Sequence, residues 1–199
     1  MSTNIKKLTL GGCCVIALSL GIANAVEAGS NYGHKYGFGT PASAADISKI
    51  DIDVMPDGRG APPGQGSYAE GKKVYADKCA ACHGADMAKP VKGTGGAPLR
   101  GGRDTLTSGK PKKTVESYWP YATTLFDYTK RAMPFNEPGS MTDNEIYAVV
   151  AYILAEGNVI SKDAVMNAKT LSKVKMPNRD GFIAFPQGDG HRPDIFNYD

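Results

Sequence analysis

The residues with the clearest chemical potential are Cys79, Cys82 and His83, which form a C-x-x-C-H motif. Two thiols at this spacing, in a turn that follows a helix, can each reach one vinyl group of a haem and form a thioether. The imidazole of the next residue then faces the iron. The motif therefore predicts covalent attachment of one haem c through Cys79 and Cys82, with His83 as the proximal iron ligand.

Three other uses of a cysteine pair agree less well with the sequence. A structural zinc site needs about four Cys or His ligands, and outside the motif the exported chain offers only the distant His34 and His191. A thioredoxin-like redox pair is expected in a βαβ pattern, which is absent. A simple disulfide between the two cysteines would leave His83 without a role.

The second axial ligand of the iron is predicted to be Met133, which lies 50 residues after His83 in the sequence RAMPF. Pro134 would hold this loop rigid, and a thioether is one of the common axial ligands of haem iron. Met176 is also followed by proline, and it remains an alternative together with His34, His191 and an open site. The other methionines of the exported chain are Met55, Met87, Met141 and Met166.

Three helices are expected to position these ligands. Capping boxes at 67–70 and 142–145 predict one helix that runs to the cysteine pair and a second that is closed by Gly157 at C′. The second helix should carry one apolar stripe. A third helix is expected over about 118–132, ending before Pro134. Beyond one short helix near 162–172, the rest reads as loop, so the predicted fold class is all-α with long loops.

The N-terminal 25 residues have the pattern of a secretory signal peptide. Lys6 and Lys7 precede an apolar stretch over 8–23, and Ala-Asn-Ala closes it at 23–25. An apolar stretch of this length is short for a helix that spans a bilayer, so no membrane span is expected after cleavage. An uncleaved anchor and a lipoprotein signal at Cys13 are the alternatives. The expected location is the periplasm of a bacterium.

The remaining chain divides into a Gly- and Pro-rich arm (26–66), a helical domain (67–157) and a C-terminal extension (158–199). The chain has 199 residues and a net charge of +3, which falls to +1 when the two lysines of the signal are removed. A basic block over 67–131 lies between two acidic extensions, but it contains no long run of like charge. Nucleic-acid binding is therefore not expected. The block is either a solvated surface or a docking face for an acidic partner.

The order of helix, C-x-x-C-H, glycine-rich loop, helix, Met-Pro and final helix over 67–157 resembles a class I cytochrome c. The resemblance implies that the carbonyl of Pro98 accepts the His83 N–H and that Leu99 lies against the haem. It also implies that Gly71 and Tyr75 of the first helix meet Tyr152 of the last. Candidates to bind the haem propionates are Trp119, Tyr121, Arg100 and Arg103.

Segments outside this core resemble the cytochrome subunits of sulfane or sulfite dehydrogenases, in the thiosulfate-oxidising multienzyme system. They are DIDV at 51–54 with the turns that follow it, YWPYATTLFDY at 118–128, RAMPF at 131–135 and KMPNRDGF at 175–182. Some relatives carry two haems, whereas this chain has one C-x-x-C-H motif.

The resemblance implies a non-catalytic electron-transfer subunit. It would receive electrons from a molybdenum-cofactor dehydrogenase subunit and pass them to a downstream cytochrome or oxidase. A free periplasmic shuttle, and a haem enzyme or sensor with an open sixth site, are the alternatives.

Overall fold

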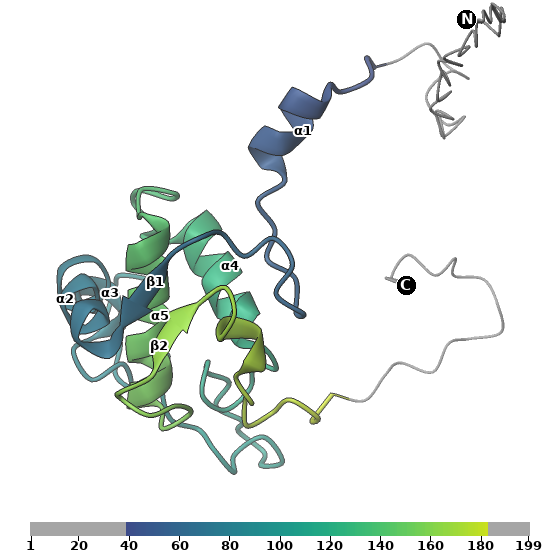
Figure 1. Ribbon diagram of the computed structural model, residues 1–199. Helices are drawn as coiled ribbons and strands as arrows, with labels where there is room; N and C mark the ends of the chain where they lie inside the picture. Colours follow the sequence, from purple (N-terminus) through teal and green to yellow (C-terminus); the bar gives the residue numbers. More distant parts are fainter. Residues whose placement is uncertain (1–38, 183–199) are drawn as a thin grey trace, which may run out of the picture. The chain divides into compact units, whose positions relative to one another are not determined.

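Helix α5 (Asp143–Glu156) forms the centre of the core, and its residues 146–155 are all buried. The computed structural model describes residues 39–182. Figure 1 shows α5 between α2 (Tyr68–Lys78) and α4 (Ala122–Ala132), with two short strands lying across it. The sequence predicts one apolar stripe, but α5 is buried on all sides because four elements pack around it. The remaining elements are α1 (Ala44–Ile50), β1 (Gln65–Ser67), α3 (Ala80–His83), β2 (Val165–Asn167) and the 3-10 turn η1 (Leu171–Lys173).

The first and last helices of the haem domain cross at a glycine, as the family resemblance implies. A Cβ added to Gly71 would lie 1.8 Å from the carbonyl oxygen of Ala148. Beside this contact, the rings of Tyr75 and Tyr152 meet with their centroids 5.4 Å apart. The absence of a side chain at residue 71 therefore lets α2 approach the backbone of α5.

The predicted helix starts of α2 and α5 are confirmed. Ser67 and Thr142 are the N-caps, and each forms a complete capping box with the glutamate three residues later. The end of α5 differs from the prediction, because Gly157 keeps a negative φ and Asn158 adopts the left-handed conformation, with φ 52°. The Asn158 and Val159 N–H groups donate to carbonyls of the last turn, which gives a Schellman motif with Asn at C′.

Helix α4 begins at Ala122, four residues later than the sequence predicts. Pro120 explains the difference, because a proline disfavours the helical conformation of the residue before it, here Trp119. The same effect acts at the other end of α4, where Met133 precedes Pro134 and is extended, with ψ 146°. The helix therefore lies between two X-Pro steps.

The predicted all-α fold class is confirmed, with the addition of one short two-stranded antiparallel sheet in the described residues. Strand β1 pairs with β2 in the register Gly66 to Met166, which joins the segment before α2 to the segment after α5. Gly66 has no room for a side chain, since a Cβ there would lie 2.4 Å from the Cα of Ala148. Ile50 is the last residue of α1, and residues 51–55 belong to no helix or strand. Residues 44–66, assigned to the arm, belong to the same compact unit as the haem domain.

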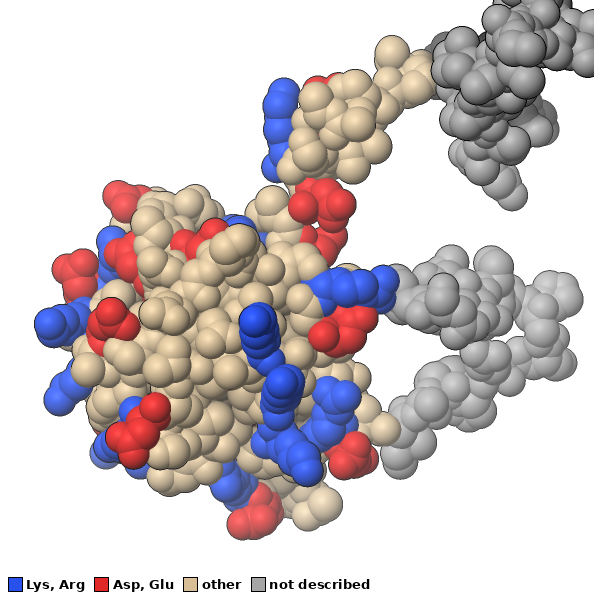
Figure 2. Space-filling model, in the orientation of Figure 1, with Lys and Arg blue, Asp and Glu red and all other residues tan. Residues whose placement is uncertain are grey.

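Several sequence predictions fall outside the described residues, namely the signal peptide, its cleavage site, His34 and His191. Within 39–182, no helix has both the length and the apolarity to cross a bilayer. Acidic and basic side chains are interspersed on the face drawn in Figure 2, in agreement with the nearly neutral composition.

Candidate haem site

The C-x-x-C-H motif lies at the junction of α2 and α3, where its three functional side chains face one cavity. Cys79 is the C-cap of α2, and its carbonyl oxygen accepts the N–H groups of Cys82 and His83 at 3.1 and 2.9 Å. This single helical turn brings both sulfurs and the imidazole to the same wall. The two cysteines are free thiols, and burial raises the pKa of Cys79 to about 11. A disulfide between the motif cysteines is therefore not the arrangement that the structure contains.

The cavity has a volume of about 380 Å³, within the range of small-molecule and cofactor sites. Four further segments complete its walls: the loop over 94–99, the segment 113–119, helix α4 with the loop that follows it, and the inner side of α5. Most of the side chains are apolar, so a planar hydrophobic ring system would be largely shielded from water. The apolar residues that line it include Pro98, Leu99, Val115, Trp119, Leu125, Val149 and Ile153.

The imidazole of His83 is oriented by a hydrogen bond of 2.8 Å between its Nδ1 and the carbonyl oxygen of Ala97. A donated Nδ1–H fixes the tautomer that leaves the Nε2 lone pair free to bind a metal. The expected acceptor, the Pro98 carbonyl, is therefore corrected to that of the preceding residue. The peptide between Pro98 and Leu99 is oriented by the Leu99 N–H, which donates to Met87 at 2.8 Å. The Ala97 carbonyl precedes proline, so its peptide has no N–H to satisfy.

Met133 is the one methionine among residues 39–182 that lines the cavity. It follows α4 directly, and its N–H closes that helix by donating to Thr129. Met176, the alternative favoured by its similar Met-Pro sequence, is 3% exposed and belongs to the hydrophobic core. The core also contains Met87, Met141 and Met166. The structure thus places His83 and Met133 around one apolar space.

The donors at this site fit a haem c group and do not fit zinc. Among residues 39–182, no group of three or more Cys, His, Asp and Glu side chains could hold a metal ion. The cavity instead combines two thiols suited to thioether formation, the imidazole of His83 with its Nε2 available, and the thioether of Met133. It has apolar walls, as a porphyrin requires.

The other predicted haem contacts divide into two groups. Pro98, Leu99 and Trp119 line the cavity. Arg100 and Tyr121 do not line it, and each has another partner. The guanidinium of Arg100 lies 3.4 Å from a carboxylate oxygen of Glu156, and the ring of Tyr121 lies under the guanidinium of Arg179 at 4.1 Å.

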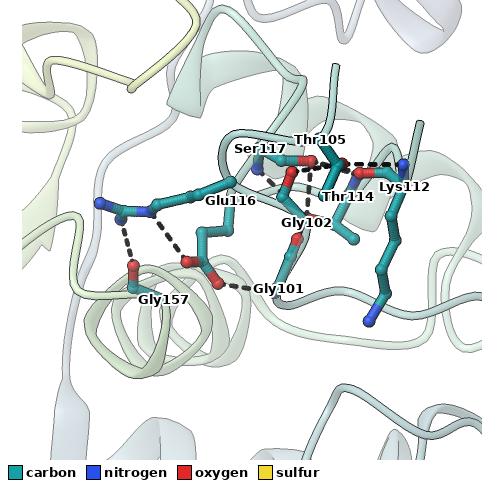
Figure 3. Close-up of polar contacts among 9 residues, drawn as sticks. Gly101, Gly102, Thr105, Lys112, Thr114, Glu116, Ser117 and Gly157 are labelled. Carbon is teal, nitrogen blue, oxygen red and sulfur yellow. Dashed lines mark hydrogen bonds and ion pairs between the residues drawn. The ribbon is translucent and has the colours of Figure 1, made fainter. Parts of the chain in front are cut away.

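Arg103 also serves the protein scaffold and is not part of the cavity wall. Its Nε lies 2.8 Å from Glu116, and its Nη2 donates to the carbonyl of Gly157 at the end of α5. Figure 3 shows this cluster, in which Glu116 also accepts the Gly101 N–H at 2.7 Å. The hydroxyl of Thr114, a cavity residue, donates to the Gly101 carbonyl at 2.7 Å. The network therefore ties one wall of the cavity to α5.

Two lysines at the cavity were not singled out from the sequence as cofactor contacts. Lys78 and Lys113 both line it, and the Lys113 ammonium lies 4.9 Å from the ring centre of Tyr118. Lysine is a common surface residue, so neither position carries a distinguishing sequence signal. Both cations could attract the carboxylates of a bound haem.

Comparison with known proteins identifies the family to which this site belongs. A family model for cytochrome c matches residues 68–156. A chain in the crystal structure of the sulfane dehydrogenase SoxCD from Paracoccus pantotrophus is 36% identical, with a TM-score of 0.69. That match covers 80% of this chain and 77% of the other. Since the family model covers less than half of this chain, the structural match also includes residues outside 68–156.

A thiosulfate dehydrogenase from Stutzerimonas stutzeri (strain A1501) is 26% identical over 127 residues. The match covers 63% of this chain but only 39% of that relative, so this chain spans about two fifths of its length. The chain belongs to the cytochrome c family, whose members transfer electrons through covalently bound haem c. Its relatives include dehydrogenases of sulfur compounds.

Proposed function

We propose that this protein is a monohaem c-type cytochrome that serves as the electron-transfer subunit of a sulfur-compound dehydrogenase. The observation that carries the proposal is the single cavity that contains Cys79, Cys82, His83 and Met133. The two cysteines would attach the haem, and His83 and Met133 would be the axial ligands. The chain itself would not oxidise the sulfur compound.

When bound, haem c supplies one-electron chemistry by cycling between ferric and ferrous iron, and an axial methionine raises its reduction potential. The role of the chain is to hold this group. Ala97 fixes the orientation of His83, and the apolar walls exclude water.

Attachment and haem count are tested by intact-mass spectrometry of the protein purified from a bacterium. A single added haem mass, retained after denaturation, is expected. The double variant C79A/C82A should lose this covalent mass. Protein that contains no covalent haem, or two haems, would contradict the proposal.

Axial ligation is tested by absorption spectroscopy of the oxidised protein. Methionine ligation gives a weak sulfur-to-iron charge-transfer band at the red end of the visible spectrum. Met133→Ala should abolish this band. Met176→Ala is the matched control, because it also truncates a methionine that precedes proline, and it should keep the band. If Met176→Ala loses the band and Met133→Ala keeps it, the axial ligand is Met176 of the C-terminal extension.

The proposed electron donor is a molybdenum-cofactor sulfane dehydrogenase. The 36% identity to a chain of SoxCD, over 80% of this chain, supports this choice of donor. The resemblance of segments in the N-terminal arm and the C-terminal extension to the same kind of subunit supports it as well. The proposed acceptor is a downstream cytochrome or oxidase. Co-purification of a molybdenum protein from the native source, and haem reduction on addition of the sulfur substrate, would support this assignment. A haem protein that elutes alone and stays oxidised would favour a free shuttle.

We also propose that the chain is exported to the periplasm after cleavage behind Ala25. N-terminal sequencing of the protein purified from the native host should begin at Val26. A sequence that begins at Met1 would exclude cleavage.

A further inference from the structure

The loop that carries Met133 has few contacts of its own beyond the cavity. Pro134 and Met141, at the two ends of the loop, are buried, and residues 135–140 between them are all exposed. The backbone hydrogen bonds within this stretch close short-range turns, in which the Glu137 N–H donates to the Pro134 carbonyl and the Ser140 N–H donates to the Glu137 carbonyl. Met133 directly follows α4, so a displacement of the end of this helix would displace the ligand.

The N-terminal arm is attached to the last turns of α4. The backbone N–H of Val54, a buried arm residue, donates to the Asp127 carboxylate at 2.9 Å. Arg131 forms an ion pair with Asp53 of the arm, and its Nε lies 3.0 Å from Asp127 on its own helix. Arg131 is two residues before Met133. The arm therefore holds the end of α4 from which the ligand loop departs.

The C-terminal extension is attached to the opposite end of α4. The side-chain amide of Asn178 donates to the Tyr118 carbonyl at 2.8 Å. The guanidinium of Arg179 covers the ring of Tyr121, which is the N-cap of α4. Phe182 packs edge-on against the ring of Tyr118, with 5.2 Å between centroids. These contacts flank Trp119, a residue of the cavity wall.

We propose that the two extensions act together as a brace on α4 that keeps Met133 in the cavity, with Asp53 and Asn178 as positioning residues. The inference rests on the proposed ligation by Met133. It assigns a role to segments 51–54 and 175–182, which the sequence analysis singled out and the haem site itself does not use. The brace contacts join these segments to 118–128 and 131–135.

The test measures how fast imidazole, a neutral ligand, displaces the methionine sulfur in the full-length ferric protein. Loss of the charge-transfer band in a stopped-flow experiment reports the displacement. Asp53→Asn and Asn178→Ala should each accelerate it by about fivefold, since each removes one interaction of partly exposed groups. The Asp53→Glu variant keeps the charge and should react at nearly the wild-type rate.

Asp57→Asn is the matched control, because Asp57 is an exposed arm carboxylate that accepts the backbone N–H of Arg59 and pairs with its guanidinium in the same turn. Its imidazole rate should equal that of the wild type. Salt should accelerate the wild type more than Asp53→Asn, because the Asp53 to Arg131 pair is screened by ions. A purely structural loss of packing would not produce this salt dependence.

The outcomes separate the two proposals. A wild-type protein without the charge-transfer band would overturn the axial assignment, and the brace with it. A wild-type protein that has the band, together with Asp53→Asn and Asn178→Ala variants that react at its rate, would overturn the brace alone.

Discussion

Replacement of Gly71 by alanine tests the closest helix contact in the haem domain. Two effects of opposite sign compete. At a solvent-exposed position inside a helix, replacing Gly by Ala raises the free energy of unfolding by about 1 kcal/mol, because alanine has the higher helix propensity. Here the new Cβ would lie 1.8 Å from the Ala148 carbonyl oxygen and 2.8 Å from the Cβ of Tyr152, so α2 and α5 must separate by more than 1 Å. Overpacking of this kind lowers the free energy of unfolding by about 1–3 kcal/mol, and by more where the added atom collides with the backbone.

We therefore expect Gly71→Ala to lower the free energy of unfolding by about 2 kcal/mol, and the midpoint of thermal unfolding by about 8 °C. Both are measured by circular dichroism of the oxidised holoprotein. Ala76→Gly, at an exposed position of α2, is the control for helix propensity and should cost about 1 kcal/mol. A Gly71→Ala protein more stable than the wild type would refute the reasoning, because propensity would then outweigh the contact.

Two further predictions concern polar groups around the C-terminal end of α5. Glu116→Ala removes the acceptor of the Gly101 N–H and the partner of Arg103, so it should destabilise by about 2 kcal/mol and accelerate hydrogen exchange at Gly101. Unchanged exchange at that amide would contradict this role. The pKa of Glu156 lies below its ordinary value of 4.5. The main cause is its hydrogen bond with the Tyr68 hydroxyl, and nearby cations lower the pKa further. The ionised carboxylate therefore contributes stability above that pH, and this is lost as the pH falls through the lower folded-state pKa. Urea titrations should show a stability difference between wild type and Glu156→Gln at neutral pH that shrinks below about pH 4, and a constant difference would exclude this linkage.

The parts of the fold with strong local signals were predictable from sequence. The capping boxes at Ser67 and Thr142 gave the starts of α2 and α5 because the cap and the glutamate act within one turn. The C-x-x-C-H motif and the Met-Pro step were likewise local signals. The family resemblance added the contact of Gly71 with α5, which no local pattern contains.

The features that sequence reasoning missed depend on contacts between distant segments. Strands β1 and β2 have three residues each, too few for an alternating pattern, and they pair across about a hundred intervening residues. The acceptor for His83 was assigned one residue too late because its choice depends on how the 97–99 backbone is held by Met87. The ion pair of Arg100 with Glu156 was also missed, because the two residues are 56 positions apart in the sequence.

The pairing of β1 with β2 has a consequence for the architecture of the whole chain. Because Gly66 and Met166 are neighbours, the arm and the C-terminal extension depart from the helical domain side by side. Both then return side chains to the hydrophobic core, Val54 from the arm and Leu171 and Met176 from the extension. The interior of this cytochrome is therefore completed by segments outside 67–157, and a chain trimmed to those residues would expose apolar surface that the two extensions now cover.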